Sequence, residues 1–437
     1  MASSKLRPTA VDLFAGAGGM TLGFEQAGFD VLAAVEFDPI HASVHEYNFP
    51  FWTTICQSVT NLTGRDIREK SAIGDRDIDV VFGGPPCQGF SLMGKRNIED
   101  ERNSLVFHFV RLVLDLQPKF FVMENVKGMT LGKSKKVLQT VIETFDIHGY
   151  QIRENYQVLN AANYGVPQNR RRLFLIGCRR DFSLPDYPQT LTQPPLKKQA
   201  QKSNLAKKTK PERQKLPLTP NVQAAIGDIP EANQYSELKY QDWVMADYGE
   251  ASLYASQLRG LIILQDDYAY PREYNSRLLT CSRRTRHTAQ TIARFAATNP
   301  GKSDRISHFH RLDLNGLCNT LRAGTASNRG AYTSPRPIHP ITPRCITVRE
   351  AARLHSYPDW FMFHATKWHG FRQIGNSVPP LLAKAIAQQI INSLGISPSK
   401  PSRICILPSR KLLQFKMTEA ENYHNLTYKA IARRIAR

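Results

Sequence analysis

The sequence predicts an α/β fold, in which a mostly parallel sheet with helices on both faces is interrupted by a small, irregular inserted domain. Short apolar runs alternate with amphipathic stretches up to about Arg180, the alternation then stops, and helical patterning returns after Arg344. Strand–helix alternation requires right-handed crossovers, which place successive strands parallel in one sheet. A chain of 437 residues is long enough for more than one domain.

Each expected element has a local pattern of its own. Apolar runs predict buried strands at residues 9–14, 31–36, 78–82, 120–124 and 173–177. Residues 103–116 predict a helix, since one helical face collects Val106, Phe109, Val110, Val113 and Leu114. Past the insert, Thr347 and Glu350 fit a capping box that opens a further helix. The pair Pro379-Pro380 precedes another helix, at residues 381–394.

The composition indicates a polyanionic partner. Lys and Arg number 58 against 37 Asp and Glu, so the net charge is +21. With 41% hydrophobic residues the chain is globular, although a merely basic globular protein remains an alternative. No apolar run approaches the roughly 20 residues that cross a bilayer, and no secretory signal is evident, so we expect an intracellular protein. The 7 scattered cysteines argue against a disulfide framework and structural zinc, and we expect no metal site.

A glycine-rich turn follows the first expected strand. It contains Gly16, Gly18 and Gly19, and such turns let a ligand approach the backbone closely. Thr21 stands where a dinucleotide fingerprint has its third glycine or alanine, while Glu36 ends the next strand, where an acid can hold ribose hydroxyls. These features favour a nucleoside ligand without a pyrophosphate, such as S-adenosylmethionine. A plain turn and a solvated strand end are the alternatives.

Two potentially reactive side chains follow later strands. Cys87 comes directly after Pro85-Pro86, and the two prolines stiffen the turn that presents the thiol as a nucleophile. Glu124 ends the next strand, and a partly desolvated carboxyl group there can donate a proton near neutral pH. Carboxyl ends of parallel strands meet at one sheet edge, so we expect the two residues to be neighbours. A core cysteine and an ordinary exposed acid are the alternatives.

Seven motifs in order resemble those of the cytosine-5 DNA methyltransferases, of the bacterial modification-methylase type. The motifs cover most of the chain outside the insert and the C-terminal residues. They are residues 12–19, Glu36, Pro86-Cys87-Gln88, Glu124-Asn125-Val126, residues 168–172 (Gln-Asn-Arg-Arg-Arg), residues 349–354 (Arg-Glu-Ala-Ala-Arg-Leu) and residues 373–380 (Gln-Ile-Gly-Asn-Ser-Val-Pro-Pro).

The resemblance implies a Rossmann-like, S-adenosylmethionine-dependent methyltransferase fold and a division of labour among the residues. Cys87 would attack C6 of a flipped cytosine in duplex DNA, Glu124 would assist at N3, and Arg170 and Arg172 would hold the base and the glutamate. The implied cofactor contacts are Phe14, Ala15, Gly16, Gly18, Gly19, Glu36, Ser58, Pro85, Leu105, Asn376 and Ser377. The family usually places an acid beside the adenine amino group, whereas here that position is Ser58 or, with another alignment, Asp66.

The resemblance also implies four parts: a catalytic domain over residues 1–180 and 345–395, a target-recognition domain over 181–344, and a basic extension over 396–437. The expected DNA contacts are Gln88, Ser91, Arg283, Arg284, Arg286, Thr320, Leu321 and Arg322. A basic linker is expected at residues 196–215, and the insert's tyrosines are expected to form its own small core. The implied protein is a cytoplasmic, nucleoid-associated monomer without a membrane contact, and a cognate restriction endonuclease would act separately.

Two rival functions fit parts of the same pattern. One is an RNA cytosine methyltransferase, although a long basic insert favours duplex DNA. The other is a DNA-binding module that has lost catalysis, which the presence of both Cys87 and Glu124 does not support.

Overall fold

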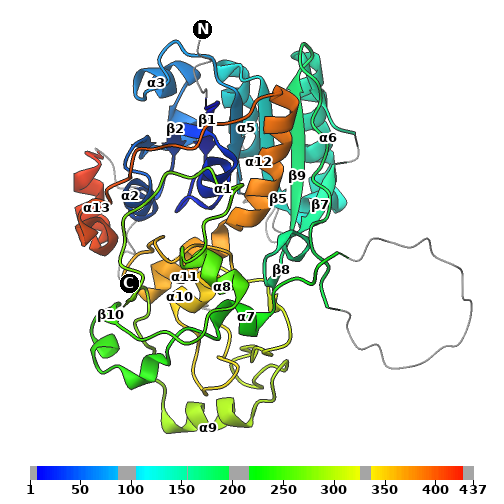
Figure 1. Cartoon of the computed structure of the whole chain (residues 1–437). Coiled ribbons are helices and arrows are strands. Elements are labelled where there is room, and N and C mark those ends of the chain that lie inside the picture. The colour runs from blue at the N-terminus through cyan, green and yellow to red at the C-terminus, as the bar shows by residue number, and fades with distance from the viewer. Residues whose placement is uncertain (1–6, 87–104, 155, 196–215, 325–335, 427–437) are drawn as a thin grey trace, which may run out of the picture.

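A computed structural model describes residues 7–86, 105–154, 156–195, 216–324 and 336–426. Its main sheet confirms the predicted α/β class (Figure 1). Parallel strands lie in the order β3 (Thr53–Ile55), β2 (Asp30–Val35), β1 (Thr9–Leu13), β4 (Val80–Gly83) and β5 (Phe120–Val126). Antiparallel strands complete the sheet: β9 (Arg171–Arg179) pairs with β5, β6 (Tyr150–Ile152) and β7 (Gln157–Asn160).

Parallel pairing was the wrong expectation for residues 173–177, which lie in the antiparallel strand β9. The physical reason is the length of the connection that precedes it. Only the stretch from β7 at Asn160 to β9 at Arg171 links these neighbouring strands, and a parallel crossover needs about a dozen residues or more. The sheet is therefore mostly parallel, with antiparallel pairing at one side.

Helices cover both faces of the sheet, because its residues alternate between two apolar layers. Phe82 packs with α1 (Gly19–Ala27) and α12 (Pro380–Leu394), while Val81 packs with α5 (Leu105–Leu116) and α6 (Gly132–Ile147). The predicted capping box is confirmed, since Thr347 and Glu350 cap α10 (Val348–Arg353). None of the helices in the described part of the chain has the length and apolar character needed to span a bilayer.

The region between residues 216 and 344 has little regular structure, as expected. It contains α7 (Val222–Ile226), α8 (Leu253–Leu258), α9 (Ala289–Ala297) and the short pair β10 (Val244–Met245) and β11 (Leu278–Leu279). Figure 1 shows these elements at the lower end of the molecule, away from the large sheet. Tyr235 and Tyr248 pack on a small local core, as predicted, whereas Tyr240 is 73% exposed. The expected basic linker at residues 196–215 lies outside the described residues.

Part of the C-terminal extension packs against the body of the protein. Its elements are η7 (Arg410–Gln414) and α13 (Met417–Tyr423), and Leu413 and Phe415 join a core that also includes residues of α2 (Pro39–Asn48) and α10. His424 Nε2 lies 3.0 Å from the Ser43 hydroxyl on α2. The described residues of the extension therefore cover one side of α2.

Buried ion pairs join the irregular region to the segment that follows it. Arg353 on α10 is fully buried, and its guanidinium lies 3.1 Å from Asp228 Oδ1 and 2.5 Å from Asp359 Oδ1. Asp228 follows α7, so the pair fixes α7 against α10. Removing Arg353 would leave Asp228 and Asp359 buried with only their longer ion pairs, to Arg259 at 3.4 Å and to Arg349 at 3.8 Å.

We therefore expect Arg353→Met to lower the free energy of unfolding by about 3–5 kcal/mol, the usual cost of breaking a buried ion pair. Urea denaturation followed by circular dichroism measures this change. The control is Arg65→Met, which removes the exposed Arg65–Glu69 pair and should leave the unfolding midpoint unchanged. Equal midpoints for all three proteins would show that the Arg353 network does not stabilise the fold.

Candidate functional site

A cavity of about 610 Å³ opens at the carboxyl ends of the parallel strands. Phe14 follows β1, Glu36 follows β2, Gly84 follows β4, and Glu124 is near the end of β5. Open α/β sheets bind ligands at this edge. Of the expected cofactor contacts, the cavity wall contains Phe14, Ala15, Gly16, Gly19, Glu36, Ser58, Pro85, Leu105, Asn376 and Ser377.

Gly18 does not line this cavity but shapes the turn beneath it. Its φ is +101°, and a Cβ at this position would lie 2.3 Å from the ring of Phe49. Gly16 has φ +58°, but a Cβ there would meet nothing within 4 Å. Both positions need glycine for their left-handed backbone, while only Gly16 borders the space that a ligand would fill.

The Glu36 carboxylate fastens the glycine turn to the end of β2. Its oxygens accept hydrogen bonds from the backbone N–H groups of Gly16 and Asp38, each at 2.8 Å. An ionised carboxylate offers about four acceptor positions, so two remain for ligand hydroxyls. Burial raises the pKa of Glu36 above its ordinary value. This geometry suits a ribose whose two hydroxyls face the cavity wall.

The structure separates the two candidates for the adenine contact. Ser58 lines the cavity, and its hydroxyl accepts from the backbone N–H of Thr60 at the start of η1 (Val59–Asn61). Asp66 instead forms an exposed capping box with Thr63 on α3 (Gly64–Glu69) and is not part of the cavity wall. Of these two residues, only Ser58 is therefore placed to contact a ligand in this cavity.

Glu124 and Arg172 form an ion pair in the same cavity. Arg172 Nε lies 2.8 Å from Glu124 Oε1, and both side chains are largely buried. The β5–β9 register places Arg172 opposite Val126, so Arg172 is the diagonal neighbour of Glu124 on one face of the sheet. Burial raises the pKa of the Glu124 carboxyl, and the charge of Arg172 opposes this rise. The pair can hold a proton donor beside a bound base.

The turn that leads to the expected nucleophile is held beside Glu124. Asn125 Nδ2 donates a hydrogen bond to the Pro85 carbonyl at 2.9 Å, and Pro85 and Pro86 line the cavity. Cys87, Gln88 and Ser91 lie outside the described residues. The chain therefore enters the segment that contains Cys87 directly from the cavity wall.

Arg170 is placed differently from the expectation and requires a correction. Its side chain is fully buried and is not part of the cavity wall, and its guanidinium donates to the carbonyls of Leu321, Gly375 and Ser377 at 3.0, 2.9 and 2.7 Å. Burial lowers the pKa of Arg170 to about 9, so the group stays charged at neutral pH. Among the described residues, Arg172 alone pairs with Glu124. Arg170 therefore ties backbone segments together.

The expected DNA contacts divide by exposure. Arg283, Arg286 and Arg322 are exposed, and Arg284 is half-buried and donates to the Asn233 carbonyl. Leu321 is only 5% exposed, so its side chain is not available to DNA, which corrects that expectation. The Thr320 hydroxyl donates to the Asn169 carbonyl at 2.7 Å. The exposed arginines stay predicted contacts.

The structure adds cavity residues that the sequence patterns did not single out. Asp12, at 1% exposure, accepts a hydrogen bond from the Thr21 hydroxyl at 2.6 Å, and burial raises its pKa to about 8. His41 and Arg372 also line the wall. Asp12 stands inside the quoted glycine motif, so its position at a strand end was a usable signal. His41 and Arg372 lie within helices and had no such signal.

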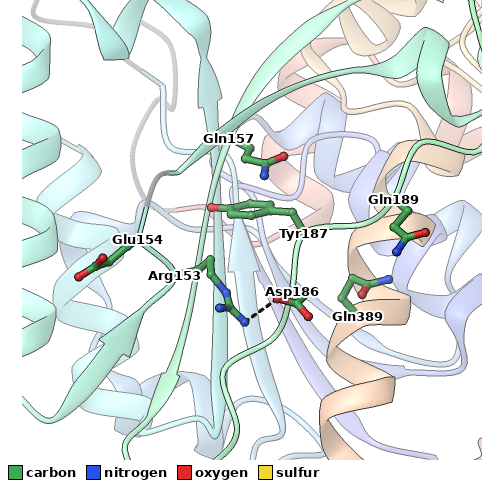
Figure 2. A pocket seen from close by; sticks show the side chains of 7 residues that line it. All are labelled: Arg153, Glu154, Gln157, Asp186, Tyr187, Gln189 and Gln389. Atoms are coloured by element: carbon green, nitrogen blue, oxygen red, sulfur yellow. Dashed lines mark ion pairs between the residues drawn. The ribbon is translucent and has the colours of Figure 1, made fainter. Parts of the chain in front are cut away.

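A second cavity, of about 450 Å³, shares no wall residue with the first (Figure 2). Its wall combines Arg153, Glu154, Gln157, Asp186, Tyr187, Gln189 and Gln389. Figure 2 shows Arg153 and Asp186 facing each other, and their charged groups are 2.7 Å apart. The Tyr187 hydroxyl donates to the Phe174 carbonyl. Because Arg153 and Asp186 pair with each other, and the expected cofactor contacts and Glu124 line the first cavity, we assign the chemistry to the first cavity.

Comparison with known proteins identifies the class of this site. A family model for C-5 cytosine-specific DNA methylases matches residues 9–392. The type II methyltransferase M.XorII of Xanthomonas oryzae pv. oryzae is 53% identical over 428 residues, which are 98% of this chain and 95% of that protein. The type II methyltransferase M.DdeI of Desulfomicrobium norvegicum is 34% identical over 408 residues, with 87% and 88% covered.

Comparison with solved structures points to the same family. A crystal structure described as a DNA modification methyltransferase encoded within an E. coli prophage matches with a TM-score of 0.69 and 32% identity, covering 89% of this chain and 99% of that one. The Dnmt2 methyltransferase of S. pombe matches at a TM-score of 0.50 and 14% identity, which is a likeness of fold alone. The chain belongs to the C-5 cytosine-specific DNA methylases.

Proposed function

We propose that this DNA cytosine methyltransferase works through a transient bond between Cys87 and C6 of a flipped cytosine, with Glu124 assisting at N3. The observation that supports it is the shared cavity. One wall has the Glu36 carboxylate and the glycine turn, which suit a nucleoside, and the other has the Glu124–Arg172 ion pair. A methyl donor and a base bound in this one cavity would lie close to each other.

The cavity wall fits S-adenosylmethionine, which supplies a methyl group on a positively charged sulfonium when bound. Glu36 retains acceptor positions for the ribose, and Ser58 is placed for the adenine. Glu36 contributes a carboxyl group to the wall, and a carboxylate stabilises a cationic ligand. We therefore assign the cofactor to this cavity.

Cytosine C5 is a poor nucleophile, and the proposed roles follow from this property. The Cys87 thiolate adds to C6, and the displaced electron pair makes C5 nucleophilic. Glu124 donates its proton or a hydrogen bond to N3 and so stabilises the charge that develops on the ring. Arg172 holds the glutamate in place. After C5 accepts the methyl group, C5 loses its proton and the sulfur–C6 bond breaks, which restores the thiolate.

Duplex DNA must open for this chemistry, since a thiol cannot reach C6 inside the stack. We assign the contacts that offset the cost of flipping to the exposed arginines of the irregular region. We also propose that the protein acts on DNA as a monomer in the cytoplasm. A restriction endonuclease that acts separately on the same sequence is the part of this proposal that the type II names of the relatives support.

The direct test is bisulfite sequencing of DNA from cells that express the protein. We expect one short sequence to be methylated at a single cytosine, and Cys87→Ser to abolish the modification. Glu124→Gln should lower the methylation rate by about a hundredfold or more, because it removes the proton donor. Glu69→Gln, on the exposed face of α3, is the matched control and should methylate normally. Unmodified DNA with the unaltered protein would refute the proposed function.

The pH dependence tests the role of Glu124 in its protonated form. Burial raises its pKa, so kcat/KM should fall as the pH increases through that raised value, where the proton is lost. Arg172 lowers the same pKa, so Arg172→Met should move this alkaline decline to higher pH, whatever its effect on the maximal rate. Arg171→Met, exposed at the start of β9, should leave the decline in place. A decline that does not move in Arg172→Met would contradict the assignment.

The adenine contact can be tested separately from catalysis. Ser58→Ala should weaken binding of S-adenosylhomocysteine by about two- to tenfold, the usual range for one lost hydrogen bond. Asp66→Ala should leave that affinity unchanged, because Asp66 lies outside the cavity wall. Isothermal titration calorimetry measures both. The opposite order of effects would show that Asp66 is the residue that recognises the adenine.

A further inference from the structure

The helix α11 (Lys367–Asn376) borders the cofactor cavity and also contacts the backbone of residues 322–323. Gly375 and Asn376 line the cavity. A Cβ on Gly375 would lie 2.3 Å from the backbone nitrogen of Ala323 and 2.4 Å from the backbone carbon of Arg322. Backbone atoms cannot give way as a flexible side chain can. The backbone of the exposed Arg322 therefore packs directly against α11, the helix that lines the cavity.

Arg170 binds the same two segments through its guanidinium. It donates to the Leu321 carbonyl on one side and to the Gly375 and Ser377 carbonyls on the other. All three bonds come from a fully buried side chain, so water does not replace them. A lysine keeps the charge but lacks the planar fork that reaches three acceptors at once.

Gln168 and His355 add a second buried connection between these segments. Gln168 accepts from the Leu321 N–H at 3.1 Å and donates to His355 Nδ1 at 2.9 Å. Because Nδ1 accepts, His355 has its proton on Nε2, which lies 3.2 Å from the Ser377 carbonyl. Burial holds the pKa of His355 well below its ordinary value, so the ring stays neutral in this arrangement.

The opposite end of α11 is also attached to the irregular region. Lys367 Nζ donates to the Arg284 carbonyl at 2.9 Å and to the Thr285 hydroxyl at 3.2 Å. These residues belong to residues 283–286 (Arg-Arg-Thr-Arg), the arginine-rich run that is expected to contact DNA. Both ends of the cavity-wall helix are thus fastened to expected DNA-contact segments, and Figure 1 shows α11 at this junction.

We propose that Gln168, Arg170 and His355 are positioning residues that couple DNA binding to cofactor binding through α11. This inference rests on the proposed function and extends it. A duplex that immobilises residues 320–322 and the arginine-rich run also immobilises the helix that walls the cofactor cavity. A duplex that favours one position of α11 therefore also favours one shape of the cavity wall, and by thermodynamic reciprocity a cofactor that prefers this shape strengthens DNA binding by the same factor.

The experiment measures the affinity of S-adenosylhomocysteine by calorimetry with and without a saturating duplex that contains the sequence found by bisulfite sequencing. In the unaltered protein the duplex should tighten binding by about 5- to 150-fold, the usual range of such coupling. We call the affinity with duplex divided by the affinity without duplex the coupling ratio. Arg170→Lys and His355→Asn should reduce this coupling ratio towards one. The reciprocal measurement, duplex affinity with and without S-adenosylhomocysteine, should give the same ratio for each protein.

Arg349→Lys is the matched control. Arg349 is equally buried and also donates to backbone carbonyls, those of Pro358 and Phe361, but none of its bonds reaches α11 or residues 320–324. This variant should lose stability yet keep the full coupling ratio. If Arg170→Lys fails to fold, Gly375→Ala tests the same junction, with Gly249→Ala as its control because a Cβ there makes only ordinary contacts.

A ratio of one in the unaltered protein, or an undiminished ratio in the folded variants, would overturn the coupling while leaving the methyltransferase proposal intact. A ratio that falls equally in Arg349→Lys would also overturn it, because loss of stability alone would then be the cause. If bisulfite sequencing finds no methylated sequence, the proposed function fails and the coupling fails with it.

Discussion

The antiparallel pairing of β5 with β9 is the constraint on which the site depends. It places Arg172 diagonally beside Glu124 on one face of the sheet and gives the buried carboxyl group a fixed counter-charge. Asn125, one residue along, faces the other way and holds the Pro85 carbonyl, so a single strand end fixes both the acid and the turn that leads to Cys87. A shift of one residue in this register would turn the acid away from the cavity.

The second organising feature is a set of buried arginines that join distant parts of the chain through backbone carbonyls and carboxylates. Arg353 fastens α7 to α10, and Arg170 fastens residue 321 to the end of α11. A buried guanidinium is expensive to desolvate, and each of these offsets that cost with several hydrogen bonds at once. The irregular region, with little sheet or helix of its own, is positioned by these side chains.

The sequence predicted the α/β class and most strand positions, because apolar periodicity is local. Of the eleven cofactor contacts that the family resemblance implied, ten line the cavity wall, and their contact with a cofactor stays a prediction. The sequence mispredicted the direction of residues 173–177 and the surroundings of Arg170, since strand pairing and long-range carbonyl contacts are tertiary. It also predicted no packing for residues 410–424. This segment was judged by its basic residues, although its apolar side chains Leu413 and Phe415 join the core. Cys87 stays a prediction drawn from the sequence.

Covalent capture tests the central claim most directly. In duplex DNA with 5-fluorocytosine at the target position, fluorine replaces the C5 hydrogen and cannot leave as a proton does. The sulfur–C6 bond then cannot break, so the enzyme should remain attached to the DNA after methyl transfer. With S-adenosylmethionine present, the account predicts a denaturation-resistant adduct, and peptide mass spectrometry should locate it at Cys87. Methyl transfer without such an adduct, or an adduct at another residue, would contradict the proposed mechanism.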